Sequence, residues 1–211
     1  MGAYFDDTAD VARRVQLRDR LIVDSLLRRA RPYAGRRIAD VGCGYHAATT
    51  RRFLAEAGSL TLVDRSVSPA LHAHPIVTAI EGALPDALEK IGDASIDVAI
   101  CSAVLEHLED PAATLRHLRR IVAPGGHCLI AVPTWVAKPI LEFLAFRVRL
   151  SETEAVAMDE HRMYYAPRDL WPLLVRSGFL PSEIRCFRHW LRLNTFAVCR
   201  KSPLARVEQR A

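Results

Sequence analysis

The chain has 211 residues, of which 50% are hydrophobic, and a formal net charge of +5. This length suits one α/β domain with an ample core, and the apolar content excludes disorder of the chain as a whole. No apolar run reaches the length of a membrane-spanning helix, and the N-terminal residues lack the basic and apolar stretches of a secretion signal. We therefore expect a single cytoplasmic domain over residues 1–211.

Helical and strand patterns alternate along the chain. An amphipathic helix is expected at 8–31, ending before Pro32. Short strands are expected at 37–41, 60–64, 76–80, 96–101 and 127–132, with helices at 47–57, 69–73, 84–91 and 111–122. Two last strands are expected at 184–190 and 194–200, and Pro124-Gly-Gly126 predicts a turn before the fifth strand. The alternation predicts a parallel sheet with helices on both faces and a ligand site at its carboxyl edge.

Residues 134–165 interrupt this regularity. The stretch 139–150 is apolar nearly all round but too short to span a bilayer. Such a segment needs a covering surface. We expect residues 134–165 to form a cover over the substrate, with packed core as the alternative.

The charge distribution and the cysteine positions limit the kinds of partner and ligand that we expect. Arginine supplies almost all of the positive charge, since only Lys90, Lys138 and Lys201 are lysines. The arginines are spread over helices rather than clustered with aromatic residues, so no nucleic-acid partner is predicted, while weak contact with an anionic membrane surface stays open. The five cysteines lack metal-ligand spacing and are expected to be reduced thiols.

A glycine-rich turn follows the first expected strand, which ends at Asp40 and turns through Gly42 and Gly44. Glycine permits unusual φ values and close approach of a ligand, and a helix beginning after the turn would favour an anionic group. The G-x-G-x-x-A spacing also fits a dinucleotide, and Asp64 at the second strand end suits the ribose of either cofactor. Asp40 favours a cofactor with an ammonium group, because a carboxylate there repels a pyrophosphate. The alternative is that both acids merely end strands.

The later motifs resemble one family. Asp97-Val-Ala-Ile-Cys-Ser-Ala-Val-Leu-Glu-His-Leu-Glu-Asp-Pro111 leads to Leu118-Arg-Arg-Ile-Val-Ala-Pro-Gly-Gly126 and then Cys128-Leu-Ile-Ala-Val-Pro133. In this order they are similar to class I S-adenosylmethionine-dependent methyltransferases of the small-molecule branch, strongly over about residues 36–133 and weakly over 159–200. The resemblance implies an α/β fold, a Rossmann-like doubly wound seven-stranded sheet of order 3-2-1-4-5-7-6 with an antiparallel last strand. It also implies S-adenosyl-L-methionine as cofactor, bordered by Asp40, Gly42, Cys43, Gly44, His46, Asp64, Arg65, Ala83, Leu84 and Ser102.

Two positions depart from the family. His46 stands where a glycine is usual, and its ring either narrows the loop, reaches the methionine carboxylate, or points away. A magnesium-dependent branch that resembles quinone-biosynthesis O-methyltransferases carries Glu-x-x-Glu-His. Here the first glutamate position is Ala103, so one ligand for a hard cation is missing and no metal is predicted.

Three side chains are candidates for catalysis. His107, beside Glu106, follows the fourth strand and could act as a base, although many relatives carry this pair without catalytic use. His161 and Tyr164 belong to a polar cluster before the last helix, where His161 could instead pack the loop. We predict methyl transfer to a small-molecule, glycan or lipid-linked acceptor, at oxygen. The alternatives are a non-catalytic cofactor-binding scaffold, favoured by His46, and an NAD-dependent oxidoreductase.

Overall fold

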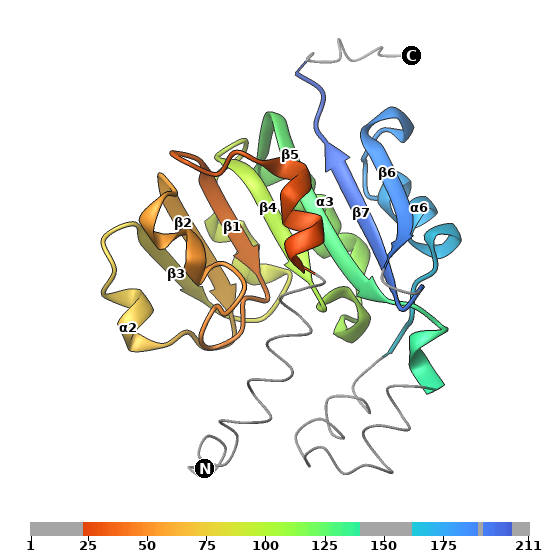
Figure 1. The fold of residues 1–211 in the computed structure, drawn as a ribbon, viewed down its shortest axis with the longest axis horizontal. Coiled ribbons are helices and arrows are strands. Elements are labelled where there is room, and N and C mark those ends of the chain that lie inside the picture. The colour runs from red at the N-terminus through yellow and green to blue at the C-terminus, as the bar shows by residue number, and fades with distance from the viewer. Residues whose placement is uncertain (1–22, 140–161, 190–191, 204–211) are drawn as a thin grey trace.

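The computed structural model describes residues 23–139, 162–189 and 192–203 (Figure 1). Seven strands form one sheet in the order β3-β2-β1-β4-β5-β7-β6. β7 runs antiparallel to both β5 and β6, whereas the other neighbouring pairs are parallel. The expected order and the antiparallel last strand are therefore confirmed. The strands are β1 (Arg37–Val41), β2 (Ser59–Asp64), β3 (Val77–Glu81), β4 (Ile96–Ser102), β5 (Val122–Pro133), β6 (Ile184–His189) and β7 (Asn194–Arg200).

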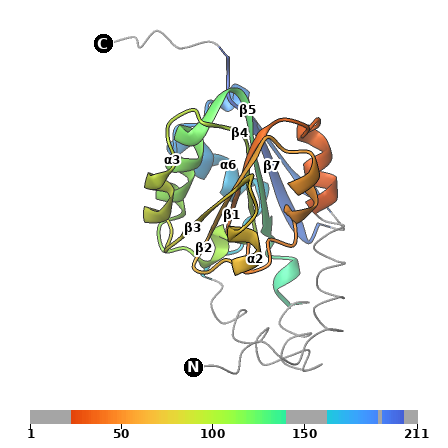
Figure 2. The same ribbon diagram turned by 90° about the vertical axis from the view of Figure 1, so that its left-hand side faces the viewer.

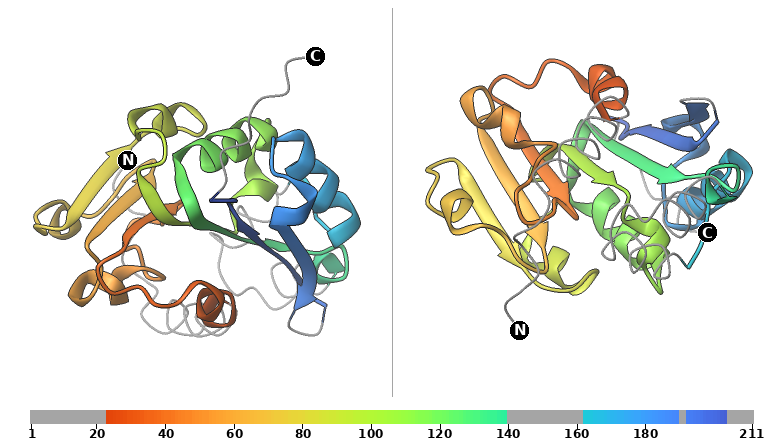
Figure 3. Two further views of the ribbon diagram at one scale, coloured as in Figure 1. Left: turned by 90° about the horizontal axis from the view of Figure 1, so that it is seen from above. Right: turned by 60° about the horizontal axis from the view of Figure 1, so that its bottom comes forward.

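Helices cover both faces of the sheet (Figures 2 and 3). The central strands β1, β4 and β5 are buried along most of their length, as expected for strands enclosed on both sides. One apolar cluster holds α3 and α6 against the sheet, and the other holds residues 23–30 and the segment around Phe53. The helices are η1 (Arg28–Ala30), η2 (Arg51–Ala55), α2 (Pro69–His72), η3 (Asp86–Lys90), η4 (Leu105–His107), α3 (Pro111–Ile121), α6 (Pro167–Arg176) and η5 (Pro181–Glu183).

The chain after the glycine turn differs from its prediction. Residues 45–50 form turns, and only the short 3-10 helix η2 follows, so the helix expected at 47–57 is wrong. Gly44 has φ +68° and Ala47 has φ +44°, which interrupts a right-handed helix at its start. The expected helix at 84–91 is likewise a 3-10 segment, η3. Anion binding at a helix N-terminus after the glycine turn therefore has no basis here.

Pro124-Gly-Gly126 also differs from its prediction, because it lies inside the long strand β5. Ile96 pairs with Val122 and Val98 pairs with His127, so four residues of β5 are looped out opposite one residue of β4. A Cβ on Gly126 would lie 2.8 Å from the carbonyl oxygen of Asp97, so this irregularity requires glycine. The segment is a bulge rather than a turn between elements.

The flanks of the expected cover are described, at 134–139 and 162–165, whereas 140–161 lies outside the described residues. Of the expected N-terminal helix, residues 23–30 are helical and 8–22 lie outside the described residues. No helix in the described part of the chain is long and apolar enough to cross a membrane.

Candidate functional site

The glycine turn and Asp64 meet at the carboxyl edge of the sheet. β1 pairs with β2 and β4, with Val41 opposite both Val63 and Cys101. The segments that follow these three parallel strands therefore leave the sheet side by side, as the right-hand view of Figure 3 shows. This edge is where the sequence places the cofactor.

Asp64 fastens the glycine turn to the end of β2. Its Oδ2 accepts a hydrogen bond of 2.7 Å from the backbone N–H of Gly44, and its Oδ1 accepts one of 2.7 Å from the N–H of Arg65. The N–H groups of Gly42 and Cys43 both donate to the carbonyl oxygen of Val63, at 2.8 and 3.2 Å. Each Asp64 oxygen keeps acceptor capacity beyond its one bond. The carboxylate can therefore hold the turn and still accept from ribose hydroxyls.

The two glycines of the turn have different surroundings. A Cβ on Gly42 would lie 2.2 Å from Cγ2 of Val104, whereas a Cβ on Gly44 would meet nothing within 4 Å. Both have positive φ, +75° and +68°. The turn is thus closed on the side of β4 and open at Gly44, where backbone can approach a ligand. The backbone at Gly44 is therefore open beside the carboxylate of Asp64.

Asp40 lies beneath the turn and is 3% exposed. Its Oδ2 accepts a hydrogen bond of 2.7 Å from Oγ1 of Thr50. Burial raises the pKa of Asp40 to about 7, although the Thr50 bond works in the opposite direction, and the charge of Asp64 raises it further. The interactions of Asp40 in the described part of the chain are the Thr50 bond and the charge of Asp64, so an ammonium group nearby would favour its ionised form. The sequence offered no signal for Thr50.

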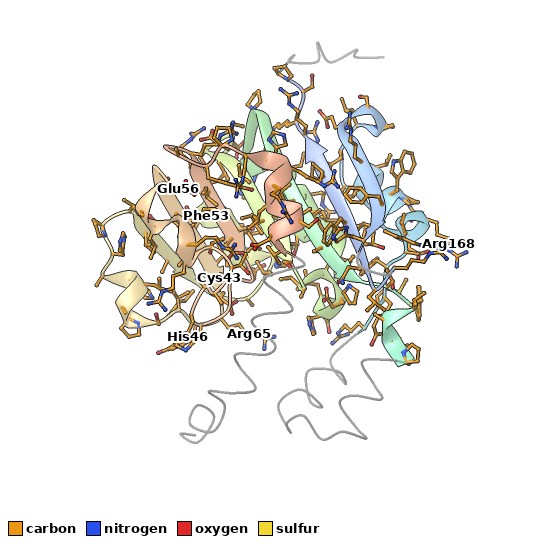
Figure 4. All side chains as sticks on the ribbon, in the orientation of Figure 1. Cys43, His46, Phe53, Glu56, Arg65 and Arg168 are labelled. Carbon is orange, nitrogen blue, oxygen red and sulfur yellow. The ribbon has the colours of Figure 1, made fainter. Side chains whose placement is uncertain are left out.

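The other expected cofactor residues are spread around this edge. Figure 4 shows Cys43 within the fold, whereas His46 and Arg65 lie at its lower margin. The exposed ring of His46 packs edge-on against Tyr45, with the ring centroids 4.8 Å apart. Cys43 is buried and donates through Sγ to the carbonyl oxygen of Gly44 at 3.3 Å. The remaining three are Ala83, which is exposed, and Leu84 and Ser102, which are half-buried.

The residues after β4 form a second part of the edge. Ala103 takes a left-handed φ of +55°, after which η4 carries Glu106 and the half-buried His107. Glu106 is 1% exposed, and its Oε2 has no hydrogen-bond partner in the described part of the chain. Burial raises the pKa of Glu106 to about 8. The motif identified this residue but gave no sign that it is enclosed. With Ala103 lacking a donor atom, this arrangement does not fit the paired carboxylates of the magnesium-dependent pattern.

The described end of the polar cluster packs onto this region. Arg162 donates its N–H to the carbonyl oxygen of Glu106 at 2.8 Å. Tyr165 donates its N–H to the carbonyl oxygen of Pro133 at 2.9 Å, and burial followed by the charge of Glu106 raises its pKa to about 12. Tyr164 is 3% exposed, with its ring centroid 5.5 Å from that of Trp135. His161 lies outside the described residues.

A pocket of about 620 Å³ beside the glycine turn was not expected from the sequence. Glu81 accepts a hydrogen bond of 2.8 Å from the N–H of Val67 and lies 3.3 Å from Nε2 of His72. The Val67 bond and then His72 lower the pKa of Glu81. The sequence could have indicated Glu81, because this acid ends β3 just as Asp64 ends β2. The pocket is lined by Tyr45, Ser66, Val67, Pro69, His72, Ala73 and Glu81.

Comparisons with known proteins agree with this fold. A family model described as a methyltransferase domain matches residues 12–181. The chain is 27% identical over 161 residues to a ubiquinone biosynthesis O-methyltransferase of Ralstonia nicotianae, covering 73% of this chain and 67% of that protein. It is 34% identical over 122 residues to the protein of the same name from Paracidovorax citrulli, covering 52% of this chain and 49% of that protein.

Among solved structures, the fold resembles phosphoethanolamine N-methyltransferase 2 of Haemonchus contortus, determined in complex with S-adenosyl-L-methionine. The TM-score is 0.61 at 17% identity, covering 84% of this chain and 51% of that one. The family model spans most of the chain, and the cofactor of this family is S-adenosyl-L-methionine. The chain belongs to the class I S-adenosylmethionine-dependent methyltransferases.

Proposed function

We propose that the chain transfers a methyl group to a hydroxyl oxygen of a small-molecule acceptor that has an apolar part. The observation that carries this proposal is the meeting of the glycine turn with the β4 and β5 ends at one edge, where apolar rings border polar groups. The names of the curated relatives support oxygen as the methylated atom and a quinone precursor as the kind of acceptor. Glycan and lipid-linked acceptors remain within the proposal.

The cofactor residues have distinct tasks in this proposal. Asp64 accepts hydrogen bonds from the ribose hydroxyls. At the same time, the hydrogen bond that it accepts from the N–H of Gly44 holds the glycine turn in place. Asp40 faces the ammonium group of the methionine moiety, which stabilises its ionised form. The family match supports this cofactor over NAD, and a bound cofactor supplies a methyl group that is already electrophilic.

Methyl transfer also requires that the acceptor be aligned with the methyl group, that water be excluded from the site and that a base remove the hydroxyl proton. We assign the removal of the hydroxyl proton to His107, because it lies half-buried just after β4 and imidazole titrates near neutral pH. Glu106 is enclosed and is a weaker candidate for direct contact. Trp135, with Tyr164 behind it, borders the acceptor on the β5 side. Alignment of the acceptor with the methyl group contributes more than the base does.

Calorimetry and a transfer assay test the proposal together. S-adenosylhomocysteine should bind and NAD should not, and labelled methyl should pass from S-adenosylmethionine to a catechol-type acceptor. His107→Gln should lower kcat about 10²–10⁴-fold at pH 7 with little change in cofactor affinity. His117→Gln, on α3, is the matched control and should retain activity. Cofactor binding without transfer to any hydroxyl-bearing acceptor would favour the scaffold alternative.

A further inference from the structure

Three large apolar side chains stand out at the carboxyl edge. Trp135 is 46% exposed, Val136 is 50% exposed and Met163 is 36% exposed. Trp135 and Val136 follow β5 directly, and Met163 precedes Tyr164, whose ring contacts Trp135. The helical turn at 137–139 projects beyond the sheet, at the lower right of Figure 1. We call Trp135, Val136 and Met163 the edge patch.

Two arginines, Arg162 and Arg192, lie close to the edge patch. Arg162 precedes Met163, and its side chain is 57% exposed while it pairs with Glu109 at 2.9 Å. The carbonyl oxygen of Arg192 accepts from Oγ1 of Thr134 at 2.6 Å, which places the β6–β7 turn beside the start of the edge patch. Arg192 itself is exposed. The edge therefore combines a tryptophan, two aliphatic side chains and guanidinium groups on one rim.

This combination matches one kind of partner. Single exposed apolar residues need no explanation, but three on one projecting edge do. Tryptophan favours the boundary between headgroups and acyl chains because its ring is apolar and its N–H is polar. Arginine near an anionic leaflet gains electrostatic attraction while its stem stays in apolar surroundings. The formal net charge of +5 acts in the same direction.

We propose that the edge patch docks the protein on an anionic phospholipid surface. Trp135, Val136 and Met163 enter the interfacial layer, while Arg162 and Arg192 face the phosphate groups. Because the edge patch lies on the same edge as the glycine turn, an acceptor with an apolar part would reach the site from the lipid. Docking itself requires neither cofactor nor acceptor, so its failure and that of methyl transfer are separate results.

Co-sedimentation of the full chain with vesicles tests the proposal. The protein should sediment with phosphatidylglycerol mixed into phosphatidylcholine at low salt, weakly with pure phosphatidylcholine, and less as salt rises. Trp135→Ala should lower partitioning about five- to tenfold, because about half of a large ring no longer enters the interface. Trp171→Ala, on α6 and 39% exposed, is the matched control and should bind like the parent.

The charge contribution has its own pair of variants. Arg192 has φ +67°, so Arg192→Gly removes the cation without adding backbone strain. It should weaken binding to anionic vesicles about fivefold and leave binding to neutral ones unchanged. Arg200→Gln, at the opposite end of β7, is the control. All variants should keep the parent's circular dichroism and Tm.

Three outcomes would overturn the proposal. One is the absence of vesicle binding at low salt, and another is an equal loss in the Trp135 and Trp171 variants. The third is a concentration-dependent dimer, without vesicle binding, that Trp135→Ala dissociates; that result would assign the edge patch to a second copy of the chain. If the protein methylates its acceptor but does not bind vesicles, the proposed function stands and only the docking proposal is refuted.

Discussion

The buried carboxyl of Glu106 should make the protein less stable as the pH rises. Its pKa is about 8 in the fold, against an ordinary value of 4.5, because burial disfavours the charged form. Below pH 4.5 both the folded and the unfolded chain hold this proton, so the group has no effect. Between pH 4.5 and 8 only the folded chain holds it, so the free energy of unfolding falls as the pH rises. Above pH 8 the loss is complete.

The magnitude follows from this window. From pH 5 to pH 8 the slope is about 1.4 kcal/mol per pH unit, which gives an upper limit of about 4 kcal/mol. Relaxation and water entry reduce such values, so we expect about 2–4 kcal/mol. Glu106→Gln removes the titration but leaves a buried polar group of similar size. The free-energy cost of burying this amide does not depend on pH. It therefore cancels when the difference between variant and parent at pH 5 is compared with the difference at pH 8.

Urea unfolding of parent and Glu106→Gln at pH 5 and pH 8 measures the effect. The stability of the variant relative to the parent should increase by about 2–4 kcal/mol between these pH values. Asp40, whose pKa is also raised, is present in both proteins and drops out of the difference. Glu109→Gln is the matched control, because its side chain is 80% exposed. A relative stability that stays within about 0.5 kcal/mol across the range would refute the reasoning.

Three further outcomes follow from described contacts. Asp64→Ala should weaken cofactor binding about 10–100-fold by calorimetry, and an unchanged Kd in a folded variant would remove Asp64 from the site. Gly42→Ala should destabilise more than Gly44→Ala, because both strain a positive φ but only the former meets Val104; equal losses in urea unfolding would contradict this. Lys201→Met should cost about 1–3 kcal/mol, because Nζ bonds the carbonyl oxygens of Arg119 and Val122 at 2.9 and 2.6 Å. The same measurement on a Lys90→Met control should change little.

Local patterns in the sequence located the strands, and the family resemblance supplied their order. Apolar runs that alternate with helical stretches located every strand, although β5 begins five residues earlier than expected, and the resemblance to the methyltransferase family implied the strand order that the structure has. The same patterns placed Gly42, Gly44 and Asp64 at one edge, because parallel strands end on the same side. These features depend on neighbouring residues and on topology, both of which a sequence carries directly.

Only the tertiary structure decided how that edge is built. The helix expected after the glycine turn does not form, since Ala47 is left-handed and Thr50 binds Asp40 instead. Glu106 lies in a polar motif, yet its side chain is buried in the fold, and its carbonyl oxygen accepts from the distant N–H of Arg162. The pocket at Glu81 and the edge patch join residues that lie far apart in the chain. Burial and long-range hydrogen bonds arise between distant segments, so no local pattern specifies them.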